Sequence, residues 1–226
     1  MKNKTLLYSI IGVALVLAIA VPVAYSILGA DPPLPVYNPA DINPKLVDES
    51  LHGKTHSHRV GGFSLTNQAG QNVTHADYEG KIYVADFFFA TCEGICPKMS
   101  AQMDRMNQVF AEDAEVMFLS HSVMPETDSV PLLAEYAHTY GATAGKWNLT
   151  TGSKKHIYEL ARKHYFAVTT EGDGGEGDFI HTENFVLVDK DKRLRGFYDG
   201  TSSEEVNRCI EDIRKLKEEY EAEVNG

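Results

Sequence analysis

Cysteine and basic residues are scarce in this chain, and each scarcity argues against a class of protein. Only 3 of the 226 residues are cysteines, too few for a small domain stapled by disulfides. Lys and Arg total 21 against 32 Asp and Glu, a formal net charge of −11, and no basic run exceeds a pair. Such a chain is a poor candidate for nucleic-acid binding. Otherwise the composition, with 43% hydrophobic and 23% charged residues, is that of a globular protein.

Charge is also missing from one long stretch, because no charged residue occurs between Thr5 and Ala30. Within it, residues 6–28 are mostly Leu, Ile, Val and Ala, and a bilayer core needs only about 20 such residues to be crossed. We expect an uncleaved membrane anchor here, with a cleaved signal peptide as the alternative. Lys2 and Lys4 precede the stretch, so the positive-inside rule keeps the N-terminus in the cytoplasm.

Shifts in composition predict the domain organisation. The prolines crowded between Pro32 and Pro44 indicate an extended, semi-rigid linker. After the linker, strand-like and helical stretches alternate, which is typical of an α/β fold with a mixed sheet. We therefore divide the chain into a cytoplasmic N-terminus (1–5), a transmembrane anchor (6–28), a Pro-rich linker (29–57) and a globular domain (58–222).

Within the domain, the hydrophobic pattern predicts individual strands and helices. The near-continuous apolar run 81–89 indicates a central strand. Met99, Met103 and Met106 follow helical spacing and are expected to be core residues rather than metal ligands. The expected strands are 81–89, 115–120, 184–189 and 194–198, and the expected helices are 97–111, 130–140, 154–163 and about 202–223.

Two of the cysteines lie close together where the first expected strand gives way to a helix, in Cys92-Glu-Gly-Ile-Cys96-Pro. Ligands of α/β proteins bind at the carboxyl ends of strands, and a helix N-terminus lowers the pKa of a nearby thiol. Two such thiols can form a structural disulfide, cycle as a redox pair or bind a soft metal. A disulfide that closes so short a loop would add little stability.

His181 bears on the choice between the redox and the metal interpretation. Thioredoxin-type enzymes have two residues between their cysteines and a proline facing them, but here three residues intervene and no proline follows Pro131. The segment before the strand at 184–189 instead contains His181. Two thiolates and one imidazole suit copper, whereas a structural zinc site needs four ligands and no fourth is evident. We therefore expect copper, as Cu(I) or Cu(II), at this set.

These residues resemble the Sco/SenC family of copper chaperones for cytochrome c oxidase. The resemblance extends from about Arg59 to Leu216. Its motifs are Asp86-Phe-Phe-Phe leading into Cys92-x-x-x-Cys96-Pro97-x-Met99, His181-Thr182 ahead of Phe185-Val-Leu-Val-Asp189, and Gly62-Phe-Ser-Leu-Thr-Asn-Gln68 upstream.

The resemblance implies a thioredoxin-like fold with an N-terminal hairpin extension, and one copper ion bound by Cys92, Cys96 and His181. It implies a role in building the dinuclear copper centre of oxidase subunit II, with subunit II and another copper chaperone or a thiol reductant as partners. We expect a single-pass protein of the cell inner membrane whose domain faces the periplasm, and a chaperone rather than an enzyme. The alternative is a metal-independent thiol–disulfide oxidoreductase that uses Cys92 and Cys96 as its redox pair.

One departure from the family pattern affects the surroundings of the thiols. The family commonly reads Ser-Val-Asp-Pro after its second strand, whereas this chain has Met124 at the position of the acid and retains Asp128 further on. This change puts the local electrostatics and partner recognition in question, but not the ligands.

No role in the site is expected for two further groups of residues. Cys209 is expected to be a buried, inert thiol. Glu171, Asp173, Glu176 and Asp178 are expected to lie in a solvated loop.

Overall fold

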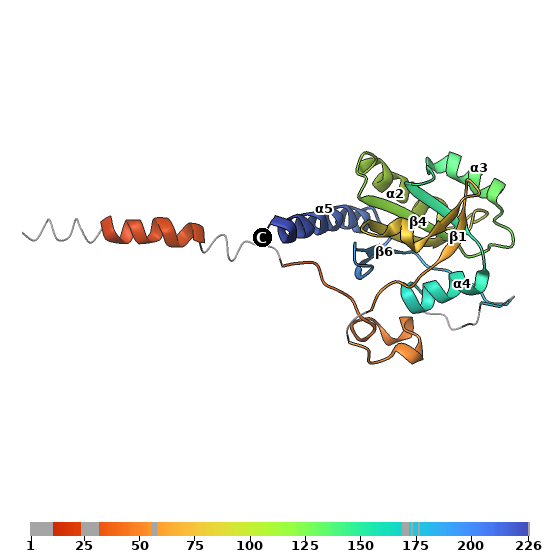
Figure 1. Cartoon of the computed structure of the whole chain (residues 1–226), viewed down its shortest axis with the longest axis horizontal. Helices are drawn as coiled ribbons and strands as arrows, with labels where there is room; N and C mark the ends of the chain where they lie inside the picture. Colours follow the sequence, from red (N-terminus) through yellow and green to blue (C-terminus); the bar gives the residue numbers. More distant parts are fainter. Residues whose placement is uncertain are drawn as a thin grey trace, which may run out of the picture. The chain divides into compact units, whose positions relative to one another are not determined.

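The computed structural model describes residues 11–23, 32–55, 58–168, 172, 174–175 and 177–225 (Figure 1). They belong to two compact units, Met1–Pro33 and Leu34–Gly226. In the first unit, residues 11–23 form a helix that contains no charged residue. Among the described residues, no helix combines the length and the apolar character needed to cross a bilayer. The predicted anchor continues on both sides of residues 11–23 into residues outside the described ranges, so it stays a prediction.

A seven-stranded mixed sheet with the order β2-β1-β5-β4-β3-β6-β7 forms the centre of the second unit (Figure 1). The central strands β3, β4 and β5 are parallel. On one side β6 pairs antiparallel with β3 and β7 with β6, and on the other β1 and β2 form an antiparallel hairpin, as the resemblance implied. The strands are β1 (Ser64–Asn67), β2 (Asn72–Thr74), β3 (Ile82–Phe88), β4 (Val116–Ser122), β5 (Trp147–Thr151), β6 (Asn184–Val188) and β7 (Leu194–Asp199).

Helices cover both faces of this sheet. Side chains of α2, α3 and α5 pack on one face, here called the α2 face. Side chains of α4 and of the π-helical turn η5 pack on the other, here called the α4 face. The helices are α2 (Cys96–Val109), α3 (Val130–Tyr140), α4 (Lys154–Glu159), η5 (Leu160–His164) and α5 (Ser203–Asn225).

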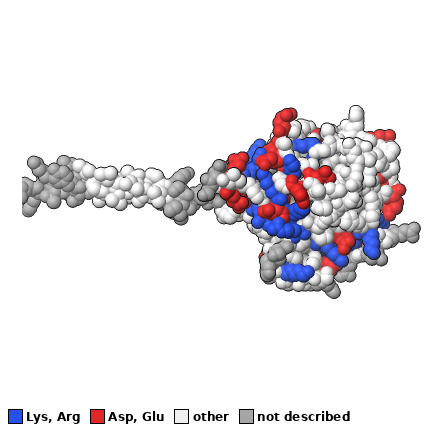
Figure 2. Space-filling model, viewed as in Figure 1, with Lys and Arg blue, Asp and Glu red and all other residues white. Residues whose placement is uncertain are grey.

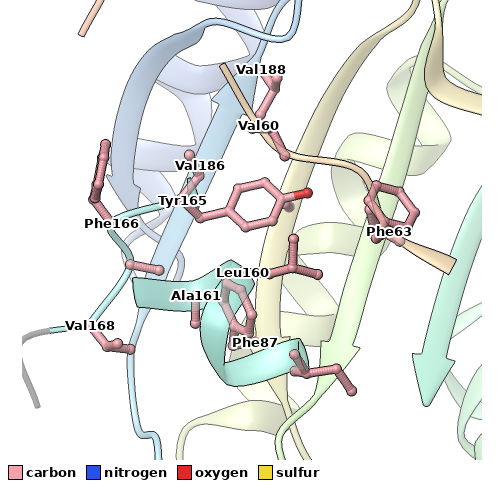
Figure 3. Close-up of a cluster of buried hydrophobic side chains, with 14 of the residues drawn as sticks. Val60, Phe63, Phe87, Leu160, Ala161, Tyr165, Phe166, Val168, Val186 and Val188 are labelled. Carbon is pink, nitrogen blue, oxygen red and sulfur yellow. The ribbon is translucent and has the colours of Figure 1, made fainter. Parts of the chain in front are cut away.

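Each face of the sheet has its own apolar core because side chains alternate along the strands. In β3, Val84 and Phe88 belong to the α2-face core, whereas Ala85 and Phe87 belong to the α4-face core. Figure 3 shows the α4-face core, where side chains from η5 and the residues after it meet those of β3 and β6. All seven residues of β3 are therefore buried, which explains its nearly continuous apolar sequence.

The Pro-rich segment is folded against the domain, whereas the sequence predicted an extended linker. From Leu34 onward it belongs to the same compact unit as the sheet. Tyr37 forms a β-bridge to Leu194, and Val47 is buried in the α4-face core. Its prolines begin two of three short 3-10 turns, Pro39–Asp41, Pro44–Leu46 and Glu49–Leu51. Apolar residues of this segment pack against the α4-face core. The burial of their side chains outweighs the local preference of the prolines for extended chain.

Strand β5 was not predicted, because polar residues occupy buried positions in it. Asn148 and Thr150 are buried, and their side chains bond to other buried polar groups, including Tyr78 and His121. This hides the apolar pattern by which a buried strand is recognised. The helix expected over 154–163 is present, but its second half is the π-helical turn η5.

The methionine stripe of α2 gives a test of the core assignment. Met99, Met103 and Met106 are fully buried in the α2-face core, as predicted. We expect Met103→Ala to lower the free energy of unfolding by about 2–5 kcal/mol, because it removes buried methylenes and leaves a cavity. Urea-induced unfolding would measure the change. Val109→Ala on the same helix, at an exposed position, is the control and should change stability by less than about 0.5 kcal/mol; equal effects would contradict the assignment.

Candidate thiol and metal site

The loop that carries the two cysteines leaves the sheet at the end of β3 and is held there by a buried carboxylate. Asp128 accepts hydrogen bonds from the backbone N–H of Ala90, at 3.2 and 3.3 Å, and from the hydroxyl of Ser122. The backbone N–H of Val123 donates to the carbonyl of Phe88 at 2.8 Å. These hydrogen bonds fix the start of the cysteine loop to the loop after β4. Met124, at the position where the family commonly has an acid, lies in that second loop and is only half-buried.

Cys92 and Cys96 lie within hydrogen-bond reach of each other but in unlike environments. Burial raises the pKa of Cys92, but hydrogen bonds from the backbone and thiol of Cys96 and from the backbone of Gly94 and Ile95 outweigh it, so the net shift is downward. Cys96 is only 3% exposed, and burial raises its pKa to about 12, with the neighbouring Cys92 and Asp86 adding to the rise. Cys92 is therefore the more acidic thiol of the pair.

Asp86 is a buried carboxyl near Cys96. From the sequence it was named only as part of a family motif. It lies between Val84 and Phe88 on the α2 face and is 1% exposed. One of its oxygens has no hydrogen-bond partner. Burial raises its pKa to about 7, despite a hydrogen bond to Ser120 that favours the ionised form. The signal for this group in the sequence was a single acidic residue inside an otherwise apolar strand, which marks a buried carboxyl.

His181 lies in the segment that enters β6, beside the end of β3. Phe179 packs edge-on against Phe89, with ring centroids 5.7 Å apart. Ile180 belongs to the α4-face core, and Thr182 donates to the carbonyl of Ala167 at 2.7 Å. His181, between these two buried residues, is exposed.

A metal set of three ligands is not assembled in this conformation. In the part of the chain that the structure describes, no group of three or more His, Cys, Asp or Glu side chains is arranged to hold a metal ion. The structure brings Cys92 and Cys96 together as free thiols, and it places the His181 segment at the same end of β3. The ligand set Cys92, Cys96 and His181 stays a prediction.

Two other residues named from the sequence, Cys209 and Asp178, are both buried side chains. Cys209 is fully buried on α5, as expected for an inert thiol, and burial raises its pKa far above the usual range. Asp178, which was expected to be solvated, is instead 7% exposed and paired with Arg162. Glu171, Asp173 and Glu176 lie outside the described residues. The partner of Asp178 could not be found from sequence because Arg162 lies sixteen positions away on another element.

The charges on the surface shown in Figure 2 are mixed in sign. Lys and Arg atoms are interspersed with Asp and Glu atoms on this face, and wide areas carry neither. Some surface charges pair locally on α5, such as Arg208 with Glu205 and Arg214 with Glu211. Exposed pairs of this kind contribute little to stability.

The buried carboxyl of Asp86 predicts a pH dependence. Its folded pKa of about 7 exceeds the unfolded value, so stability contributed by this group is complete below about pH 4 and is lost as the pH rises through 7. We expect Asp86→Asn to be more stable than the parent by roughly 1–3 kcal/mol at pH 8, with no advantage near pH 4. Urea unfolding across this range would measure it, with the exposed Glu211→Gln as control. An advantage that does not change with pH would contradict the assignment.

Comparisons with known proteins agree with this geometry. A sequence model of SCO1/SenC matches residues 52–218. The SCO1 protein homolog of Bacillus subtilis is 34% identical over 160 residues, which are 70% of this chain and 82% of the relative. The solved structure of BsSco, described as a member of the Sco family of cytochrome c oxidase assembly proteins with a disulfide switch, is 32% identical with a TM-score of 0.60 over 72% of this chain and 95% of that one.

A more distant structure, Bradyrhizobium japonicum ScoI with copper bound, shares the fold at 21% identity, with a TM-score of 0.55 over 71% of this chain and 99% of that one. These matches confirm a mixed α/β, thioredoxin-like fold. The family match includes Cys92, Cys96 and His181 and covers well over half of the sequence. The chain therefore belongs to the SCO1/SenC family.

Proposed function

We propose that this chain is a copper-binding assembly factor that helps build the dinuclear copper centre of cytochrome c oxidase subunit II, with Cys92, Cys96 and His181 as copper ligands. The observation that carries the proposal is the pair of free thiols at the N-terminus of α2, with the His181 segment entering the sheet beside them. Related proteins are described as oxidase assembly factors, and one was solved with copper.

The unequal thiols suit a metal that is taken up and passed on. Thiolate sulfur is a soft ligand that selects Cu(I) and also binds Cu(II). Cys92 ionises more readily than Cys96, and the strongly protonated Cys96 must lose its proton when a metal binds. Copper affinity should therefore rise with pH, and the buried, protonated Cys96 gives the site a route to release its cargo.

His181 adds a harder nitrogen ligand to the two sulfurs. Two thiolates suffice for Cu(I), which accepts low coordination numbers, whereas Cu(II) favours additional nitrogen or oxygen ligands. Because His181 is exposed, its ring can turn toward the thiols without an uncovering of the core. His181 would then distinguish the two oxidation states of copper.

A thiol–disulfide oxidoreductase is the second candidate, and the unequal thiols are the observation that favours it. The less buried, more acidic Cys92 would attack a partner disulfide, and Cys96 would then release the reduced partner by closing the Cys92–Cys96 bond. Two electrons and two protons would pass from the dithiol to the partner. This role would need neither copper nor His181.

The membrane attachment is part of the same proposal. A span over residues 6–28 with Lys2 and Lys4 on the cytoplasmic side would place the domain on the periplasmic side of the inner membrane. An anchor there would hold the thiols on the side of the membrane where an extracytoplasmic copper domain is assembled.

Copper titration of the reduced full chain in detergent tests the metal role. We expect one tightly bound copper, with a thiolate-to-Cu(II) charge-transfer band that is lost in Cys92→Ser and kept in Cys209→Ala, the matched control. His181→Ala should weaken Cu(II) by more than the about 10–100-fold typical of losing an outer-shell partner and should weaken Cu(I) less. Absence of tight copper in a chain whose disulfide cycles readily would favour the oxidoreductase.

Carbonate extraction and thiol labelling test the attachment. The full chain should stay with the membrane pellet at high pH, whereas a chain beginning at Leu34, where the compact unit starts, should be released. A maleimide that cannot cross the inner membrane should label Cys92 in cells with a permeable outer envelope. Extraction of the full chain, or labelling only after lysis, would contradict the proposed topology.

A further inference from the structure

The segment that carries His181 is held at its beginning by a buried ion pair. Arg162 donates two parallel hydrogen bonds to Asp178, from Nη1 to Oδ2 and from Nη2 to Oδ1, both 2.7 Å long. The two side chains are only 11% and 7% exposed. This forked geometry is the strongest form of Arg–carboxylate pairing, and it joins η5 to the residues that lead into β6.

Further contacts surround the Arg162–Asp178 pair. The backbone N–H of Gly174 donates to Oδ2 of Asp178 at 2.8 Å. The hydroxyl of Tyr158 lies 3.3 Å from the carbonyl of Asp178 and 2.9 Å from that of Val123, in the loop after β4. The guanidinium of Arg162 stacks over the Tyr158 ring, 5.4 Å from its centroid. Asp178 is thus the point at which the glycine-rich stretch meets the α4 face of the domain.

The residues after Asp178 show what this attachment positions. The even-numbered Asp178, Ile180 and Thr182 are all fixed on the α4 face, by the ion pair, by the core and by a hydrogen bond respectively. Phe179 and His181 are exposed between them. The residues on both sides of His181 are thus anchored, while His181 itself stays exposed in the segment that passes the end of β3.

We propose that the Arg162–Asp178 pair is a clamp that positions the His181 segment, and that it thereby governs how readily His181 reaches copper held by Cys92 and Cys96. This inference rests on the proposed function for its copper part. The clamp residues touch neither metal nor thiol, so they are positioning residues. Without the pair, the segment loses its charged link to η5, and near Asp178 it keeps the hydrogen bond from Tyr158 to the Asp178 carbonyl and the packing of Phe179 on Phe89.

Two substitutions test the clamp in the reduced full chain. Asp178→Asn removes the charge and keeps the size, and Arg162→Lys keeps a charge but loses the fork. Glu211→Gln, which breaks the exposed Arg214–Glu211 pair, is the control. In the metal-free protein, both clamp variants should speed hydrogen exchange at amides 177–183 and leave that of α5 unchanged. Exchange at 177–183 equal to that of the control in both variants would overturn the clamp.

Copper affinity supplies a readout that a merely structural role would not change. Asp178→Asn should weaken Cu(II) by about tenfold, as is typical for a lost outer-shell partner, and leave Cu(I) unaltered. In a chain that already carries His181→Ala, the same substitution should have no further effect. Additive losses would show that Asp178 does not act through His181 and would overturn the inference.

The failure of the two proposals can be told apart. If exchange accelerates in both clamp variants but His181→Ala alone leaves Cu(II) affinity unchanged, the clamp holds the segment and the proposed ligand set is wrong. If His181→Ala weakens Cu(II) and neither clamp variant changes exchange or affinity, the ligand set is supported and the clamp is overturned.

Discussion

The burial of β3 between two apolar cores is the constraint on which the rest of the structure depends. Because helices and turns cover both faces, the strand lies fixed along its whole length. The chain can leave the sheet only at Phe88, and Asp128 holds the next residues at Ala90. Both cysteines therefore emerge from a rigid edge at the start of α2. Such a scaffold suits a site that exchanges copper or electrons, because it keeps the two sulfurs in position while successive partners bind and dissociate.

The same strand gives the site its electrostatic character. Asp86 places a carboxyl in the core near Cys96, and its charge adds to the burial that opposes ionisation of the Cys96 thiol. Of the two thiols, Cys92 is the more readily ionised. Cys96 loses its proton when a metal cation binds its sulfur or when the sulfur enters a disulfide bond. Copper binding and oxidation thus draw on the same pair of protons, which links the two proposed functions physically.

Much of this architecture could be read from sequence because its patterns are local. The apolar run of β3, the methionine stripe of α2 and the final helix each follow from the pattern along a short stretch. The cysteine loop was found for the same reason. Strand β5 escaped because buried polar residues interrupt its pattern, and their partners, such as Tyr78 and His121, come from other strands and turns. The Pro-rich segment was expected to stay extended because its contacts to the core are long-range.

By itself the sequence determined the α/β class, the two thiols at a helix N-terminus and the charge-free N-terminal stretch, because each depends on residues that are neighbours in the chain. Only the tertiary structure decided which thiol is acidic, since burial and hydrogen bonding differ between Cys92 and Cys96. It also decided that Asp178 is buried and paired with Arg162, and that His181 emerges beside the end of β3. Those outcomes depend on which distant segments meet, and that is set by the packing of the two cores rather than by any local pattern.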